Sequence, residues 1–239
     1  MKLLIAGAIL GAMIGGAAAA DLPVKAAPAP MIGTTFPIAS SGVYYGLYTA
    51  GAAGSADVQN VPAGINAASL TTTQGEVGGI VGYRFGSSNM QRFIDIEADL
   101  GWMNLNGNNA GLSLSGPVAA EVGARIGVPA AAITSLFPNL GLPNFMLPVP
   151  TGVTTLSTQM YVGGAARFED ISPAVGAASN QQWAISPALW IGMLQALSNG
   201  TALDGRFEII WPANACIGPV PGACANMGQR YMAKVGLLF

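Results

Sequence analysis

An uninterrupted alternation of apolar and acidic residues runs from Ile94 to Leu100. In a β-strand successive side chains point to opposite faces of the sheet, so this stretch places apolar side chains on one face and three carboxylates on the other. The carboxylates are Asp95, Glu97 and Asp99. Three like charges on one strand face repel each other, and the remainder of the chain therefore has to bring cationic groups opposite them.

The same two-residue period recurs in seven further segments, at 43–50, 76–85, 118–127, 156–169, 182–193, 203–211 and 230–239. Most of them have the length of a membrane-crossing strand, about 9–11 residues. One segment is ambiguous, because the alanines and glutamate within 117–128 also favour an amphipathic helix. With that segment counted as a strand, the pattern predicts an all-β fold, an eight-stranded antiparallel transmembrane β-barrel.

The charged residues of these segments share one face. The opposite face carries no charge in the middle of any segment. The charged face holds eight acidic and six basic residues: Glu76, Arg84, Asp95, Glu97, Asp99, Glu121, Arg125, Arg167, Glu169, Asp204, Arg206, Glu208, Arg230 and Lys234. Three carboxylates on one strand also suit Ca²⁺ or Mg²⁺. With this many arginines on the same face, we expect a network of ion pairs and no metal site.

Two closed barrels fit such a sheet. A soluble barrel turns its apolar face inward, whereas a membrane barrel turns it toward lipid and its charges toward the lumen. The chain has only 9 Lys+Arg and 11 Asp+Glu among 239 residues, too few to cover a water-exposed surface comfortably. Gly and Ala dilute the charged face, as the narrow interior of an eight-stranded barrel requires. These observations favour the membrane barrel.

The ends of the chain predict its organisation. Residues 1–20 have the charged start, apolar run and A-x-A end of a signal peptide, and the run is short for a membrane anchor. Residues 21–40 read as an extended Pro/Ala-rich linker and 41–239 as the barrel, with a long apolar loop at about 129–152. We expect extracellular loops at 54–70, 105–111 and 170–180, and a turn at 106–109.

Residue types also limit the chemistry. The chain has no histidine, which excludes Ser-His-Asp and Cys-His catalysis. We therefore predict a protein that is not an enzyme and needs no cofactor. A net charge of -2 gives no basic footprint for nucleic acid. In an exported chain Cys216 and Cys224 would form a disulfide, whereas in a cytosol they would be two free thiols.

Two parts of the sequence resemble a known family. The segment Asp21–Ala26 resembles the mature start of small outer-membrane barrel proteins of alphaproteobacteria, which are OmpA-like or opacity-protein-like. The other end resembles an outer-membrane assembly signal, with Tyr231, Ala233, Val235, Leu237 and Phe239 at alternate positions. The segments 78–83 and 96–102 are similar to that family's second and third strands. Two features depart from the family: the first strand opens with Ser41 where the family usually has Trp, and the apolar loop has no counterpart.

The resemblance implies that the protein lies in the outer membrane of a Gram-negative cell. It also implies contact with outer-membrane lipids and lipopolysaccharide, and with the barrel assembly machinery during biogenesis. Its members are structural or surface-contact proteins, and some are porin-like. We therefore expect a structural or interaction barrel with a charge-filled lumen, acting through its loops. The alternative is a narrow porin-like channel for ions or small solutes.

Overall fold

A computed structural model describes residues 41–59, 69–86, 92–109, 112–130, 147–175, 178–216 and 224–239. The predicted signal peptide and linker lie outside the described residues. The strands are β1 (Ser41–Gln59), β2 (Ser69–Gly86), β3 (Phe93–Asn109), β4 (Leu112–Pro129), β5 (Thr155–Val175), β6 (Ala178–Ser179), β7 (Gln182–Leu197), β8 (Ala202–Ile210), β9 (Ala213–Cys216), β10 (Cys224–Met227) and β11 (Arg230–Leu238).

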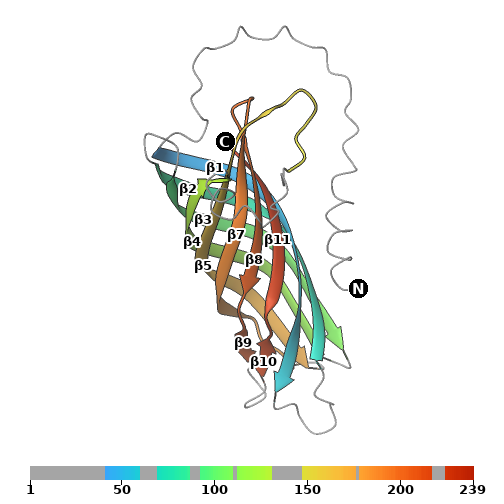
Figure 1. Cartoon of the computed structure of the whole chain (residues 1–239). Coiled ribbons are helices and arrows are strands. Elements are labelled where there is room, and N and C mark those ends of the chain that lie inside the picture. Colours follow the sequence, from blue (N-terminus) through green and yellow to red (C-terminus); the bar gives the residue numbers. More distant parts are fainter. Residues whose placement is uncertain are drawn as a thin grey trace, which may run out of the picture. The chain divides into compact units, whose positions relative to one another are not determined.

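The described strands form one closed antiparallel sheet (Figure 1). Going around the wall, the long strands follow the order β1, β2, β3, β4, β5, β7, β8 and β11, and β11 pairs with β1 again, with Leu47 opposite Leu237. The short strands β9 and β10 continue β8 and β11 past short breaks and pair with each other. The predicted eight-stranded antiparallel barrel is confirmed.

The segment that the sequence left ambiguous is a strand. β4 runs through residues 112–129 and pairs with β3 and β5. In this register Arg125 stands opposite Asp95, and Glu121 stands opposite Arg167. A helix would not place both charges beside these partners, so the tertiary pairing outweighs the helical propensity of its alanines.

The strands run further than predicted, and the expected loops are wrong in extent. β1 continues to Gln59 and β2 begins at Ser69, so residues 54–59 and 69–70 of the loop expected at 54–70 are strand. β3 runs to Asn109, which places the predicted turn at 106–109 inside a strand. β5 runs to Val175, so residues 170–175 of the loop expected at 170–180 are strand. Backbone pairing extends because these polar residues alternate with apolar ones that pack inward.

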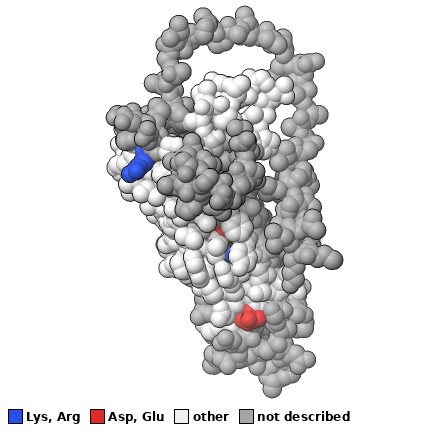
Figure 2. All heavy atoms as spheres, viewed as in Figure 1, with Lys and Arg blue, Asp and Glu red and all other residues white. Residues whose placement is uncertain are grey.

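The outer surface of the barrel carries a belt of exposed apolar side chains, called the apolar belt below. Every one of its members points away from the lumen, and most of them are more than 40% exposed. The belt comprises Val43, Tyr45, Leu47, Val77, Val81, Tyr83, Phe85, Ile94, Ile96, Leu100, Trp102, Val122, Ile126, Leu156, Val162, Trp183, Ile185, Ile191, Phe207, Trp211, Tyr231, Leu237 and Phe239. Figure 2 shows an outer face with almost no charged atoms on its described part.

Beyond the belt the strands project into a part with the opposite polarity, called the extension below. It is built from residues 53–59, 69–75, 103–109, 112–117 and 170–175, together with β6, β9 and β10. Its inward side chains are mainly apolar and buried: Ala56, Leu70, Met103, Leu105, Leu114, Ile171, Ala213 and Met227. Its outward side chains are polar and exposed: Ser55, Asp57, Thr71, Thr73, Asn104, Asn106, Asn108, Ser113 and Ser115. The extension is thus arranged like a water-soluble barrel, and the sequence analysis missed it.

The end of the predicted apolar loop lies against the outside of the wall. The residues 131–146 are outside the described part of the chain, and residues 147–154 precede β5 without regular pairing. The backbone N–H of Leu147 donates to Oε1 of Gln195 at 2.7 Å. A side chain at Gly205 would touch that of Leu147, 3.0 Å away. The side chain of Gln195 points outward because of its position on β7, and the hydrogen bond from Leu147 satisfies its amide oxygen.

The tip of the extension holds the disulfide Cys216–Cys224, which joins β9 to β10. The carbonyl of Cys216 accepts hydrogen bonds from the side chains of Asn180 at 3.2 Å and Gln182 at 2.5 Å. These amides connect β9 to the start of β7. Within the described residues, no helix is long and apolar enough to cross a membrane.

Replacing both cysteines with serine is expected to lower stability without abolishing folding. Closing a loop of this size contributes roughly 2–3 kcal/mol by restricting the unfolded chain. The charged interior lies outside the loop and remains intact. Urea unfolding of the purified protein under non-reducing conditions measures the difference. Labelling of wild-type thiols by a maleimide in urea, before any reduction, would contradict the disulfide.

Candidate functional site

The lumen of the barrel is filled by charged side chains. All fourteen of the charged residues assigned to one face by the sequence point inward, and none is more than 4% exposed. They come from β2, β3, β4, β5, β8 and β11. Only Asp57 and Arg92 are exposed among the described charged residues. The alternation of side chains therefore separates almost all charge from the outer wall.

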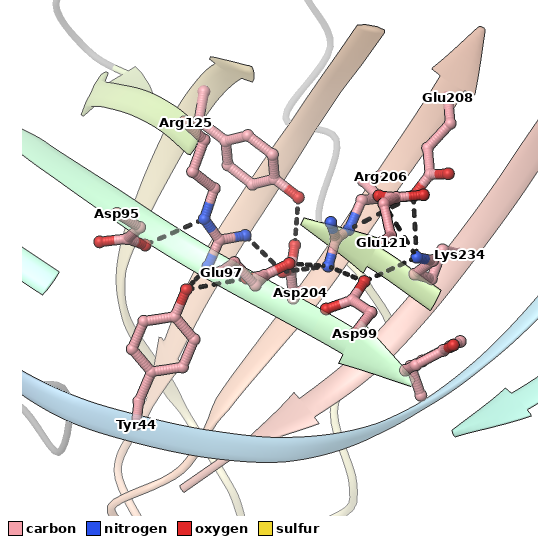
Figure 3. A network of polar contacts seen from close by, with 12 residues as sticks. Tyr44, Asp95, Glu97, Asp99, Glu121, Arg125, Asp204, Arg206, Glu208 and Lys234 are labelled. Atoms are coloured by element: carbon pink, nitrogen blue, oxygen red, sulfur yellow. Dashed lines mark hydrogen bonds and ion pairs between the residues drawn. The ribbon is translucent and has the colours of Figure 1, made fainter. Parts of the chain in front are cut away.

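One neutral cluster, the Arg125 cluster, contains Arg84, Asp95, Glu97, Arg125, Asp204 and Arg206. Arg84 binds Asp95 through two hydrogen bonds of 2.8 and 2.7 Å. Arg125 donates to Asp95 at 2.9 Å and to Asp204 at 2.5 Å, and its Nη2 lies 3.3 Å from Glu97. Arg206 donates to Glu97 from the opposite side. Three acids and three bases balance, and Figure 3 shows Arg125 reaching across the lumen between them.

A second neutral cluster, the Glu169 cluster, lies toward the extension and contains Glu76, Arg167, Glu169 and Arg230. Arg167 donates to Glu169 at 2.9 Å and also binds Glu76. Arg230 binds both oxygens of Glu169 and donates to the amide oxygen of Gln74 at 3.0 Å. Two acids and two bases balance here. Pairing and hydrogen bonding of this kind are the condition under which charges can remain buried.

The third cluster, the Lys234 cluster, is acid-rich. The ammonium of Lys234 lies 2.8 Å from Asp99, 3.1 Å from Glu208 and 3.9 Å from Glu121 (Figure 3). Arg206 lies 3.4 Å from Asp99 and 3.8 Å from Glu208, and Arg167 donates to Glu121 at 3.1 Å. Both arginines are already engaged by the neutral clusters. Three carboxylates here share one cation of their own.

Each of the three acidic residues between Ile94 and Leu100 forms ion pairs with basic side chains. Asp95 pairs with Arg84 and Arg125, Glu97 with Arg125 and Arg206, and Asp99 with Lys234 and Arg206. The ion-pair partner of Arg230 is Glu169 on β5. Among the described residues, no group of three or more acidic or cysteine side chains has the arrangement of a metal site.

Inward aromatic residues complete the site, and the sequence analysis did not identify them. The hydroxyls of Tyr44, Tyr161 and Tyr48 donate to Glu97, Asp204 and Glu76, respectively. Arginine guanidinium groups stack on rings, with Arg84 4.0 Å from Phe93 and Arg206 4.7 Å from Trp190. Two-residue parity could have found them, because Tyr44 and Tyr161 share their face with Gly46 and Arg167.

The inward glycines make room for these rings and also for charged side chains, since a Cβ at Gly101 would overlap the side chain of Glu76 and one at Gly54 that of Arg230. A Cβ at Gly82 would overlap the ring of Tyr44, and one at Gly192 would overlap Tyr161. A Cβ at Gly123 would lie 2.5 Å from Trp190. Aromatic rings thus extend across the narrow lumen and pack against glycine residues of the wall.

Apolar side chains close the charged interior at both ends. On the extension side Leu70, Leu105 and Leu114 are at most 2% exposed. At the end that carries the carboxyl terminus, Leu194 and Leu238 are at most 1% exposed and point inward. The charges are therefore enclosed along the axis as well as around the wall.

No protein-family model and no curated protein matches this chain. Solved structures with similar arrangements include Neisserial surface protein A, with 14% identity over 82% of this chain and 97% of that chain and a TM-score of 0.40. The Ail protein of Yersinia pestis, in complex with a heparin analogue, matches with 10% identity over 82% and 99% at a TM-score of 0.36. The amino-terminal β-barrel domain of Pseudomonas aeruginosa OprF matches with 9% identity over 80% and 97% at 0.36. At these TM-scores the likeness carries no assignment for this chain.

Proposed function

We propose that the protein is a structural and interaction barrel of the outer membrane, with a closed lumen and no enzymatic activity. The observation that carries the proposal is its inverted polarity. Over the apolar belt, large apolar side chains face outward and every described charge faces inward. In water such a surface would expose a continuous apolar band, whereas in a bilayer it is the stable arrangement.

The belt has the dimensions of a membrane span. It covers residues 77–85 of β2, 94–102 of β3 and 183–191 of β7, each near the 9–11 residues that a tilted strand needs. The outward side chains change to Asn, Thr and Ser where the extension begins. We place this change at the outer surface of the membrane, where the outward face of the wall meets water.

The closed lumen leaves the outer surfaces as the working parts. Both neutral clusters bridge the lumen, and apolar side chains close it at each end. The extension presents rows of uncharged hydrogen-bonding groups, because Thr73, Asn106 and Ser115 stand side by side on adjacent strands. We propose that the extension contacts envelope components or surface partners, and that the apolar belt contacts outer-membrane lipids and lipopolysaccharide.

The carboxyl-terminal strand supports recognition during assembly. Phe239 exchanges two backbone hydrogen bonds with Tyr45, of 2.7 and 3.3 Å, and so closes the barrel. Tyr231, Leu237 and Phe239 are exposed on the outer wall. Ala233 and Val235 share this outward position. We propose that this row is the signal read by the barrel assembly machinery after export through the periplasm.

A gel shift on the membrane fraction tests the assignment. In a dodecyl sulfate gel, the unheated protein is expected to migrate faster than the boiled protein. The unheated barrel stays folded and compact, because its closed sheet has no free edge from which to unfold. Recovery of the full-length exported chain in the soluble periplasm would contradict the membrane location.

Planar bilayer recordings separate this function from the alternative, a narrow channel. The wild-type protein is expected to give no steady open events, because the ion pairs and the apolar ends exclude a continuous water path. Open events of uniform size that scale with salt would favour the channel for ions or small solutes. An empty-vesicle preparation from the same purification is the control.

A further inference from the structure

The charge imbalance of the lumen is localised. The Arg125 cluster holds three acids and three bases, and the Glu169 cluster holds two of each. The two extra carboxylates therefore fall in the Lys234 cluster, where Asp99, Glu121 and Glu208 surround one ammonium. All four residues are at most 4% exposed. Two uncompensated negative charges in such a place are strongly unfavourable, because a buried charge loses most of the solvation that bulk water gives it.

A second observation points to the same place. Among the described residues, the buried carboxylate oxygens that accept no hydrogen bond are Oδ1 of Asp99, Oε1 of Glu121, both oxygens of Glu208, and one oxygen of Asp170 on the outer wall. Four of these five belong to the Lys234 cluster. Glu208 is completely buried and directed at Lys234, yet neither of its oxygens has a hydrogen-bond donor. One unpartnered donor, Nε of Arg206, lies 3.8 Å from Oε1 of Glu208, beyond hydrogen-bond distance, so both oxygens of Glu208 remain without a hydrogen bond.

A proton supplies compensating charge and a hydrogen-bond donor within reach of these oxygens. A protonated carboxyl group loses its charge and gains one O–H donor, which a neighbouring carboxylate oxygen can accept. Carboxyl groups that share a confined site retain a proton because both cannot ionise together. A metal ion would also supply charge, but no described group of these residues has a metal-site arrangement.

We propose that the Lys234 cluster is a proton-binding site, in which Asp99, Glu121 and Glu208 hold at least one proton at neutral pH. The proton comes from solvent when the barrel folds, and no bond other than the O–H bond forms. The O–H group donates to an adjacent carboxylate oxygen of the cluster. The site exists whether or not the barrel conducts ions, so it goes beyond the proposed function.

Other charged or titratable groups face this cluster from several strands. They are Tyr48 on β1, Glu76 on β2, Glu97 on β3, Arg167 on β5, and Asp204 and Arg206 on β8. All six have a partner in one of the neutral clusters, or donate to one. β7 presents Trp190, which does not titrate, opposite Glu208.

Infrared spectroscopy of the full-length folded protein tests the site. A protonated carboxyl group has a C=O stretch separate from the carboxylate bands. We expect this band at neutral pH in the wild type and its loss or weakening in Glu208→Gln or Glu121→Gln. A matched control is Glu169→Gln, which alters an equally buried but fully paired glutamate. That variant is expected to keep the band while losing stability, because two arginines lose their partner.

Each result decides the proposal. A wild-type spectrum without the band overturns it, including the case in which sodium ions instead raise the unfolding midpoint. A band that survives unchanged in the triple variant D99N/E121Q/E208Q overturns it as well, because the proton then lies elsewhere. A band lost only in the triple variant supports a proton shared within the cluster. If one single variant does not fold, the other single variants give the same comparison.

Stability should also depend on pH in a definite direction. A folded state that binds more protons than the unfolded state loses stability as pH rises. We expect the urea midpoint of the wild type to fall between neutral pH and about pH 9, below the range in which lysine titrates. Glu208→Gln is expected to remove most of this slope. An unchanged slope in the triple variant D99N/E121Q/E208Q would contradict the site.

Discussion

Replacing Arg125 with methionine is expected to destabilise the barrel by about 3–5 kcal/mol, the usual cost of removing one partner from a buried ion pair. Arg125 is 1% exposed and binds Asp95, Asp204 and Glu97. Methionine fills much of the same space but leaves three acids facing two bases. The folded fraction in a heat-modifiability gel and the urea unfolding midpoint, followed by tryptophan fluorescence, measure the loss.

Two further variants test whether the charge of Arg125, and not its packing, accounts for the loss of stability. Arg92→Met removes an exposed arginine and is expected to leave the midpoint unchanged. In the double variant R125M/D204N the asparagine removes the extra negative charge, and part of the lost stability should return. A double variant as unstable as the sum of its single changes would instead indicate that the arginine acts through its packing against Tyr161, whose ring lies 4.5 Å from it.

Replacing Ile96 with arginine is expected to lower the free energy of unfolding by about 2–4 kcal/mol, the usual cost of a cation on the lipid face of a membrane barrel. Ile96 is 52% exposed and lies in the apolar belt of β3. Ten residues further along the same strand, Asn106 is also exposed and points outward, but in the extension. Asn106→Arg is therefore expected to change stability little. Both variants are refolded into lipid vesicles, and their unfolding in urea is compared.

This pair of variants distinguishes the membrane barrel from a soluble one. In water both positions would accept an arginine with similar and small effects, because each side chain is exposed. Equal stabilities of Ile96→Arg and Asn106→Arg in vesicles would therefore contradict the position of the membrane. A large loss for Asn106→Arg alone would place the membrane around the extension.

Prediction from sequence succeeded for the barrel wall and failed beyond it. In the belt, apolar residues alternate with charges, and the pattern is easy to recognise over ten residues. In the extension, residues such as Leu105 and Leu114 alternate with Asn106 and Ser115. Asn, Ser, Thr and Gly are also typical of loops, so composition suggested loops where the pattern continued. The inward aromatics were not predicted for a related reason: aromatic residues carry no charge and occur on both faces of the wall, so only their position in the alternation distinguishes them.

The sequence by itself determined which face each residue of the belt occupies. That assignment requires only that side chains alternate along a strand, which holds whatever the neighbouring strands are. Asp95, Glu97 and Asp99 therefore share one face before any fold is known. Ion-pair partners, in contrast, depend on register and closure, which bring Asp95 to Arg125 and Asp99 to Lys234 across the sheet and the lumen. Only the tertiary structure decided that two of the three clusters balance and that the surplus negative charge collects around Lys234, because this balance depends on distances across the lumen.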